Sequence, residues 1–185
     1  MIEIKTIEIA GMASGLQALR LPFGKECRSK CDAQFSIDKS GMIAHSETTS
    51  VISPKDLQLM STLVKCGDSH AKCLRGLIVY AEIDASVYWW CEAECYRAGH
   101  ERLSSASTMH CECKGLSGDE LVKAKSEIPM GKSLKKIDMF SYQCLRNIVK
   151  QREGHRLPEW KVFIDWVKSL PFANELILVG LDKDK

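Results

Sequence analysis

The chain lacks a long hydrophobic run, and it lacks an excess of charge of one sign. Its 185 residues contain 26 Lys and Arg against 24 Asp and Glu, which gives a formal charge of +2. Because so balanced a chain attracts polyanions only weakly, we expect neither a nucleic acid polymer nor a membrane as partner. No apolar stretch approaches the roughly 18 residues by which a membrane-spanning helix is recognised.

The marks of a secreted protein are also missing. A secretory signal begins basic and continues apolar, whereas the first residues here include acidic Glu3. We therefore expect a cytoplasmic protein. Nine cysteines are many, but an odd number in a chain of this length argues against a disulfide framework. We expect reduced thiols, most of them small core residues.

Nothing in the sequence requires a second domain. A chain of this length buries roughly 70% of its unfolded surface as one unit, and an apolar fraction of 45% with 27% charged residues is ordinary for a globular protein. We expect a single domain over residues 1–185. Residues 22–50 mix Gly, Ser, Lys and Asp with few apolar residues, which predicts an irregular connection within it.

A strand and a helix are predicted early in the chain. Residues 1–10 alternate apolar and polar positions, and the alternation changes phase near Lys5-Thr6, which indicates a strand with a bulge. Ser53 followed by Pro54 is typical of a helix start, and the apolar spacing that follows predicts about three helical turns. Gly67 is expected to end that helix.

A second strand and an aromatic helix follow. Residues 76–84 are rich in β-formers, with one apolar face. Residues 86–98 are predicted to be helical, and the helical period would then place Trp90, Glu94 and Arg97 on one stripe. A carboxylate and a guanidinium would thus share an aromatic-flanked face.

The second half of the chain is predicted to be mainly helical. A hydroxyl-rich segment at 103–110 and a glycine turn at 115–118 precede a helical start at 119–125. The two clearest helices are expected at roughly 138–152 and at 158–169, the second opened by proline. We expect an α+β fold, a small antiparallel sheet packed with helices.

The order of these motifs resembles the flavin-dependent thymidylate synthases. Gly67-x-x-His70, the strand, the aromatic helix ending in Arg97 and the Ser-rich loop match the first half of that family, and Ile128-Pro129 with the segment Phe140–Asn147 matches the second. The resemblance covers residues 55–178, about two thirds of the chain. Short phage-encoded relatives are closer still, as the motifs Tyr88-Trp-Trp90, Ser107-Thr-Met-His110 and Glu159-Trp160 indicate.

The resemblance implies an activity and an assembly. Its members methylate the uracil ring of deoxyuridine monophosphate (dUMP), with reduced flavin adenine dinucleotide (FAD) as hydride donor and methylenetetrahydrofolate as carbon source, and need no cysteine nucleophile. They form homotetramers whose sites are shared between subunits. We therefore expect a homo-oligomer that binds a pyrimidine nucleotide, in the host cytoplasm if the chain is phage-encoded.

The resemblance also implies site residues. The catalytic positions, which fix and polarise the nucleotide, would be Arg97, Ser107 and Arg152. The remaining nucleotide-binding positions would be Glu94, Ser105 and Lys125. The flavin-binding positions would be Asn147 and His155. A phosphate dianion needs convergent cations and hydroxyls, which this set supplies. Glu94 stands where the family has a glutamine that reads the base. Because glutamate only accepts hydrogen bonds, an amino-bearing ring such as cytosine is an alternative ligand.

Other interpretations remain open at this stage. Where the family has Arg-His-Arg to hold the flavin, this chain has Arg97-Ala98-Gly99. A non-catalytic nucleotide-binding or nucleotide-sequestering phage protein is therefore the main alternative, and an oligomeric scaffold is another. Arg97 and Arg152 could also be solvated cations at helix ends, where the dipole favours them.

A zinc site is the last alternative. It would use cysteines and a histidine that lie close in sequence, namely Cys27, Cys31, Cys91, Cys95, His110, Cys111 and Cys113. Zinc ligands usually come as Cys-x2-Cys pairs, whereas two cysteines four apart on a helix more often pack against a neighbour. We therefore expect no metal site.

Overall fold

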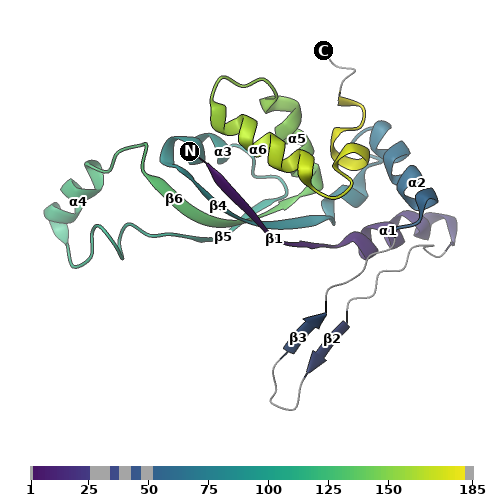
Figure 1. Ribbon diagram of the computed structural model, residues 1–185, viewed down its shortest axis with the longest axis horizontal. Helices are drawn as coiled ribbons and strands as arrows, with labels where there is room; N and C mark the ends of the chain where they lie inside the picture. Colours follow the sequence, from purple (N-terminus) through teal and green to yellow (C-terminus); the bar gives the residue numbers. More distant parts are fainter. Residues whose placement is uncertain (1, 26–33, 38–42, 47–51, 182–185) are drawn as a thin grey trace.

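The molecule is built around a four-stranded antiparallel sheet. The computed structural model describes residues 2–25, 34–37, 43–46 and 52–181 (Figure 1). The strands follow the order β1-β4-β6-β5. Their bounds are β1 (Glu3–Ala10), β4 (Ile78–Ser86), β5 (His100–Ser105) and β6 (Ser133–Ser141). This arrangement confirms the predicted α+β class with a small antiparallel sheet.

Helices cover one face of this sheet. Helix α5 (Tyr142–Arg152) and helix α6 (Pro158–Ser169) lie side by side over it, and the short α3 (Val87–Ala93) leads out of β4 (Figure 1). The core lies between the two layers. Its largest buried side chains include Trp89, Trp160 and Phe163, whose ring centroids lie 5.0 to 5.7 Å apart.

Several predicted elements are confirmed. Helix α2 (Pro54–Lys65) begins at the proline and ends before Gly67, and α6 has the predicted bounds. The inward face of β4 is completely buried at Val79, Ala81 and Ile83, as the alternation predicted. The register shift in β1 lies between Thr6 and Glu8, next to the predicted bulge.

Two predicted helices have different bounds. The helix expected over 86–98 ends at Ala93, so Trp90, Glu94 and Arg97 do not form one helical stripe. Trp90 turns into the core instead, and its indole donates to Leu134 O at 2.8 Å. The helix expected over 138–152 begins only at Tyr142, because residues 133–141 pair with β4 and β5 as a strand.

Two short strands occur where an irregular connection was expected. Within residues 22–50, β2 (Gln34–Ile37) pairs with β3 (Ile43–Ser46), and most of the remaining range lies outside the described residues. Helix α1 (Met12–Arg20), which no motif had indicated, begins after Gly11. Gly11 has a φ of 84°, and a Cβ there would lie 1.8 Å from Gly76 O, so only glycine fits this contact.

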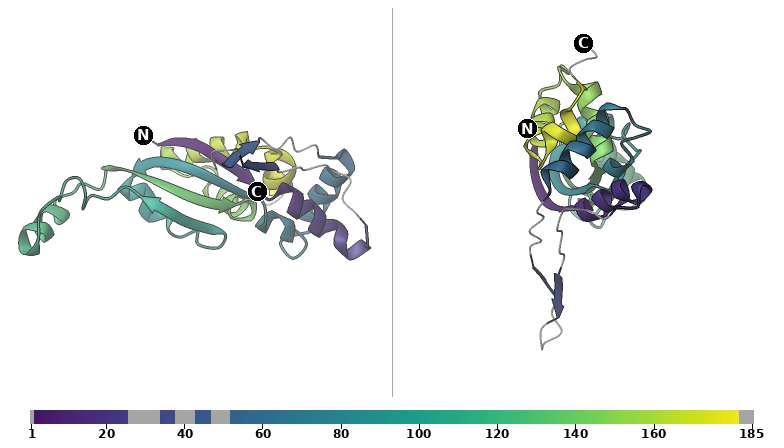
Figure 2. Two further views of the ribbon diagram at one scale, coloured as in Figure 1. Left: turned by 90° about the horizontal axis from the view of Figure 1, so that it is seen from below. Right: turned by 90° about the vertical axis from the view of Figure 1, so that its right-hand side faces the viewer.

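A long excursion between β5 and β6 projects from the body. It contains α4 (Gly118–Ser126), which extends to the far left of Figure 1, away from α5 and α6. Figure 2 shows the same separation from below. None of the helices in the described ranges is both long and apolar enough to cross a bilayer.

Candidate functional site

Charged side chains gather where α3, β5 and β6 meet. We call this group the edge-strand cluster: Glu94, just after α3, His100 and Arg102 from the edge strand β5, and Lys136 and Asp138 from β6. These residues come from segments up to 44 positions apart, so the sheet pairing brings them together.

The register of β6 turns two of these charges toward the core. Lys136 pairs with Ile83 and Asp138 with Ala81, and both partners face the helix-covered side of the sheet. Lys136 and Asp138 are themselves buried. A buried charge is tolerated only when it is paired and hydrogen-bonded, so both side chains require partners inside the protein.

Asp138 is a buried carboxylate that contacts both His100 and Arg102. Its Oδ2 lies 2.7 Å from His100 Nε2, and its Oδ1 accepts from Arg102 Nε at 3.2 Å. His100 Nδ1 lies 2.9 Å from Tyr96 O. Each ring nitrogen of His100 thus faces an oxygen atom, one of the Asp138 carboxylate and one of a backbone carbonyl. Its ring stacks on Phe140 at 4.5 Å.

Glu94 closes the solvent side of the same cluster. Its Oε1 accepts from Arg102 and lies 3.8 Å from Lys136 Nζ. Both cations also lie over the Trp90 ring, with Lys136 Nζ 4.3 Å and Arg102 Cζ 5.1 Å from its centroid. The hydrogen bond from Arg102 lowers the pKa of Glu94, and burial together with the charge of Arg102 lowers the pKa of Lys136.

A second cluster surrounds the end of α5. Arg152 NH1 donates to Glu92 Oε2 at 3.0 Å, and its Nε donates to Tyr96 OH at 2.7 Å. The guanidinium stacks over the Trp160 ring at 4.8 Å. Trp160 Nε1 donates to the same Glu92 oxygen at 2.8 Å, and His155 Nε2 lies 2.9 Å from Arg152 NH1. Arg152 and His155 therefore meet, with Glu92 as their shared anion.

The other predicted nucleotide residues lie before β5, at its end and on the projecting excursion. Arg97 is exposed in the turn after α3, where its Nε donates to Glu94 O at 3.3 Å. Ser105 ends β5 and donates to Ala106 O, and Ser107 Oγ accepts from Met109 N at 3.2 Å. Lys125, on α4, donates to Thr108 Oγ1.

The five predicted phosphate ligands do not converge within one chain. Lys125 lies on the far α4, and it contacts the segment that contains Ser107 and Thr108. Arg152 lies on α5, over the sheet (Figure 1). Asn147 is half-buried on α5, and its amide makes no hydrogen bond to any other residue in the described ranges.

Gly99 stands where the resembled family has an arginine. Its φ is 77°, and a Cβ at this position would lie 2.2 Å from Ser141 Oγ. Gly99 O also accepts from Ser141 N at 2.7 Å, which ties this turn to the start of α5. A side chain is excluded here by both the backbone conformation and the lack of space.

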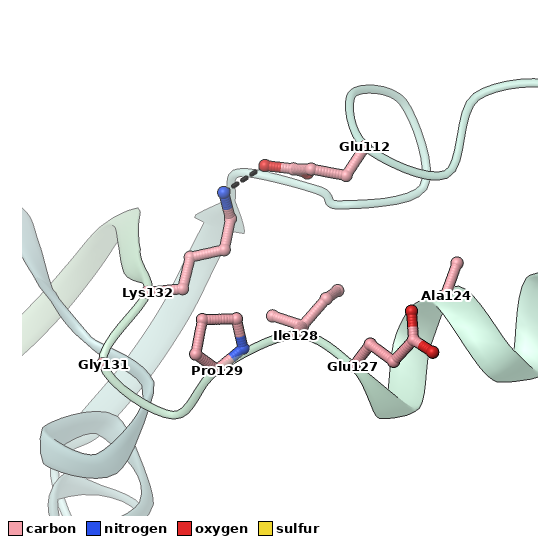
Figure 3. Close-up of a pocket in the computed structure, with 7 residues that line it drawn as sticks. All are labelled: Glu112, Ala124, Glu127, Ile128, Pro129, Gly131 and Lys132. Carbon is pink, nitrogen blue, oxygen red and sulfur yellow. Dashed lines mark hydrogen bonds and ion pairs between the residues drawn. The ribbon is translucent and has the colours of Figure 1, made fainter.

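An open pocket of about 490 Å³ lies on the projecting excursion (Figure 3). Its lining residues are Glu112, Ala124, Glu127, Ile128, Pro129, Gly131 and Lys132. An ion pair between Lys132 and Glu112 closes one side. The predicted site residues do not line this pocket, although Lys125 neighbours it on α4.

The cysteines are placed as separate thiols in the described ranges. No group of three or more His, Cys, Asp or Glu is arranged there to hold a metal ion, while Cys27 and Cys31 lie outside the described residues. Cys91, Cys95 and Cys111 are exposed. The packing role expected for most cysteines therefore applies only to buried ones such as Cys144 and Cys73.

Thiol labelling is expected to divide the cysteines sharply. Iodoacetamide at neutral pH should modify Cys66, Cys91, Cys95 and Cys111 quickly, because they are exposed. Burial raises the pKa of Cys144 to about 12, which leaves almost no reactive thiolate. Peptide mass spectrometry over a time course measures each rate, and a urea-unfolded sample, in which all should react, is the control. Equal rates for Cys144 and Cys66 would contradict the described burial.

The residues that sequence reasoning missed are Glu92, Arg102, Lys136 and Asp138. Each forms close ion pairs within one of the two clusters. The available signal was the alternation of charged and apolar residues over Lys136-Ile137-Asp138-Met139, which is a strand pattern. That signal is usable only once the segment is recognised as a strand with its charged face inward.

Comparison with known proteins gives a clear likeness in structure alone. No protein-family model and no curated protein sequence matches this chain. Two crystal structures of the flavin-dependent thymidylate synthase ThyX from Helicobacter pylori, each with FAD and dUMP, are similar to it at 14% identity. One matches with a TM-score of 0.65 over 95% of this chain and 97% of its own. The other matches with a TM-score of 0.66 over 98% of this chain and 99% of its own. The chain therefore has the fold of a flavin-dependent thymidylate synthase along nearly its whole length.

Proposed function

We propose that this chain is a flavin-dependent thymidylate synthase-like protein that binds dUMP and methylates it with FAD and methylenetetrahydrofolate. The observation that supports this most is the structural match to ThyX with FAD and dUMP over nearly the whole of both chains. A match over nearly the whole of both chains supports the proposal more than a match of one layer would.

The proposed nucleotide ligands lie on several elements. Arg97 lies in the turn before β5, whereas Ser105 and Ser107 lie at and beyond its other end, and their exposed or half-exposed polar groups are accessible to a phosphate. Lys125 joins them through Thr108. Hydroxyl, ammonium and guanidinium donors are the groups that suit a phosphate dianion. Their role is to hold and orient the nucleotide.

A homo-oligomer is part of this proposal. Arg152 lies apart from Lys125 within one chain, so a nucleotide site using both requires a second copy to supply one of them. Light scattering coupled to gel filtration measures the assembly, with a tetramer expected. A monomer at micromolar concentration would remove this part of the proposal.

The flavin site fits the chain only in part. Bound FAD would supply the hydride for the new methyl group. The Asn147 amide is free among the described residues to meet a flavin ring. His155 is not, because Nε2 faces Arg152 and Nδ1 accepts from Leu157 N at 3.2 Å.

A nucleotide-binding protein without turnover is the second candidate. Gly99 favours it, because the chain has no room for a side chain at a position where the resembled family holds the flavin. The engagement of His155 favours it as well. Under this candidate, the nucleotide residues work unchanged and no methyl transfer follows.

Replacing Arg97 by alanine is expected to weaken dUMP binding about tenfold, because one charge-assisted contact to the phosphate is lost. Isothermal calorimetry of the full-length protein measures the dissociation constant. Arg75→Ala removes an exposed cation on another surface and is the matched control. Equal affinities for the two variants would exclude Arg97 from the site.

Two further measurements separate the candidates. The absorbance spectrum with added FAD reports flavin binding, and conversion of dUMP to thymidylate in the presence of reduced FAD and methylenetetrahydrofolate reports turnover. Both positive results support the enzyme. Binding of dUMP without either supports the sequestering protein, and no binding of dUMP or FAD leaves only an oligomeric scaffold.

A further inference from the structure

Two cations of the edge-strand cluster lie side by side and share one ion-pair partner on the solvent side. Arg102 and Lys136 both approach the same oxygen of Glu94, Arg102 as a hydrogen-bond donor and Lys136 at 3.8 Å. Like charges this close repel each other. A single carboxylate oxygen therefore balances two positive groups on this side of the cluster.

The two cations are fixed in place from behind. The Trp90 ring lies beneath both, and buried Asp138 orients the Arg102 guanidinium through its Nε at 3.2 Å. Lys136 has only 10% of its side chain exposed. Groups held this firmly keep their direction when the anion in front of them changes, which is the condition for a preorganised binding site.

Glu94, in contrast, is the most exposed member of the cluster. Its side chain is 44% exposed, and it is the residue that caps the C-terminal end of α3. The helix dipole does not favour a carboxylate at that end. A rotation of the Glu94 side chain into solvent would open both cations without disturbing the buried part of the cluster.

We propose that Arg102 and Lys136, backed by Trp90, form a binding site for a phosphate monoester, and that Glu94 occupies this site until the phosphate displaces it. A phosphate dianion suits the pair better than one carboxylate does, because it brings two charges and three acceptor oxygens to two cations. The inference stands apart from the proposed function, since free phosphate is sufficient to test it.

The test compares phosphate binding in two variants that each lose one negative charge. Glu94→Gln removes the displaceable carboxylate, and Glu101→Gln removes an exposed one from the neighbouring position of β5, whose side chain points away from Arg102. Calorimetry with inorganic phosphate at constant ionic strength measures the affinity. We expect Glu94→Gln to bind about tenfold more tightly than the parent chain, because it loses a nearby like charge, and Glu101→Gln to stay within about twofold.

A third variant removes one of the cations. Lys136→Met keeps the aliphatic length over Trp90 and should weaken phosphate binding about tenfold through the lost charge. If its thermal unfolding shows that it does not fold, the pair Glu94→Gln and Glu101→Gln decides alone. Undetectable phosphate binding by Glu94→Gln, or equal affinities for Glu94→Gln and Glu101→Gln, would overturn the proposal.

The same proteins then show whether the phosphate of the nucleotide or another phosphate binds at this site. Tighter binding of dUMP by Glu94→Gln, with deoxyuridine unaffected, would place the nucleotide phosphate at this site. Tighter binding of inorganic phosphate with an unchanged affinity for dUMP would mean that the site takes a second phosphorylated ligand. Either result supports the site, and failure of dUMP to bind at all would count only against the proposed function.

Discussion

Replacing Asp138 by alanine is expected to lower the free energy of unfolding by about 3–5 kcal/mol, the usual cost of removing one partner from a buried ion pair. Asp138 is completely buried, His100 Nε2 lies 2.7 Å from its carboxylate, and Arg102 Nε donates to it. Alanine would remove the hydrogen-bond partner of the His100 ring and one of the two carboxylates that pair with Arg102. Urea unfolding at pH 7, followed by tryptophan fluorescence, measures the change.

Two variants serve as controls, one for the volume of the Asp138 side chain and one for the loss of any carboxylate. Asp138→Asn keeps the size but loses the charge and turns a donor toward donors, so most of the loss should remain. Asp165→Ala removes an exposed carboxylate from α6 and should change stability by no more than about 0.5 kcal/mol. If Asp138→Ala unfolded at the same urea concentration as Asp165→Ala, the buried network would not stabilise the fold.

The elements that the sequence predicted well are those whose apolar pattern decides their burial. Helix α6 begins at Pro158 and has apolar residues on one face at helical spacing. Strand β4 alternates buried and half-buried residues along its length. In both, the local pattern and the tertiary environment require the same structure, and such agreement is typical of natural sequences.

Strand β6 was missed because it carries charged residues on its buried face and apolar residues on the other. Residues 133–141 direct Lys136 and Asp138 toward the helices, and leave Ile137 and Met139 on the other face. A search for amphipathic strands assumes that charges face solvent. The charges of β6 face inward only because Arg102, His100 and Glu94, distant in sequence, neutralise them.

The candidate site also has residues that the sequence predicted and contacts that only the packing determines. Resemblance in sequence pointed to Arg152 and His155, and the structure brings these two together. Their common partner Glu92 lies 60 positions before Arg152, on the aromatic helix, and Trp160 lies beyond the next turn. No local pattern could reveal that Arg152 is already paired, since the pairing depends on how α3 packs against α5 and α6.

The protein is expected to lose stability steeply between pH 9 and pH 12. Burial raises the pKa of the Cys144 thiol from 9.0 to about 12, and raises that of Tyr142 from 10.0 to about 12. Above pH 9 the unfolded chain releases these protons while the folded chain keeps them, so rising pH favours unfolding. One pKa unit corresponds to about 1.4 kcal/mol, so the full shifts amount to about 4 kcal/mol for Cys144 and about 3 kcal/mol for Tyr142 at pH 12. Urea unfolding at half-unit steps from pH 8 measures this slope.

Variants of Cys144 and Tyr142 show how much each side chain contributes to the fall of stability with pH. Cys144→Ala should be less stable at pH 8, because it leaves a small cavity, but its stability should fall less between pH 9 and pH 10, because only the Cys73 thiol, whose pKa burial also raises, still contributes there. Cys66→Ala removes an exposed thiol and should keep the parent slope. Tyr142→Phe also loses the hydrogen bond to Pro171 O at 3.0 Å, so its slope above pH 10, rather than its absolute stability, is the informative quantity. A parent slope that Cys144→Ala leaves unchanged would mean that the thiol ionises in the folded chain, and hence that water reaches the interface between α5 and the sheet.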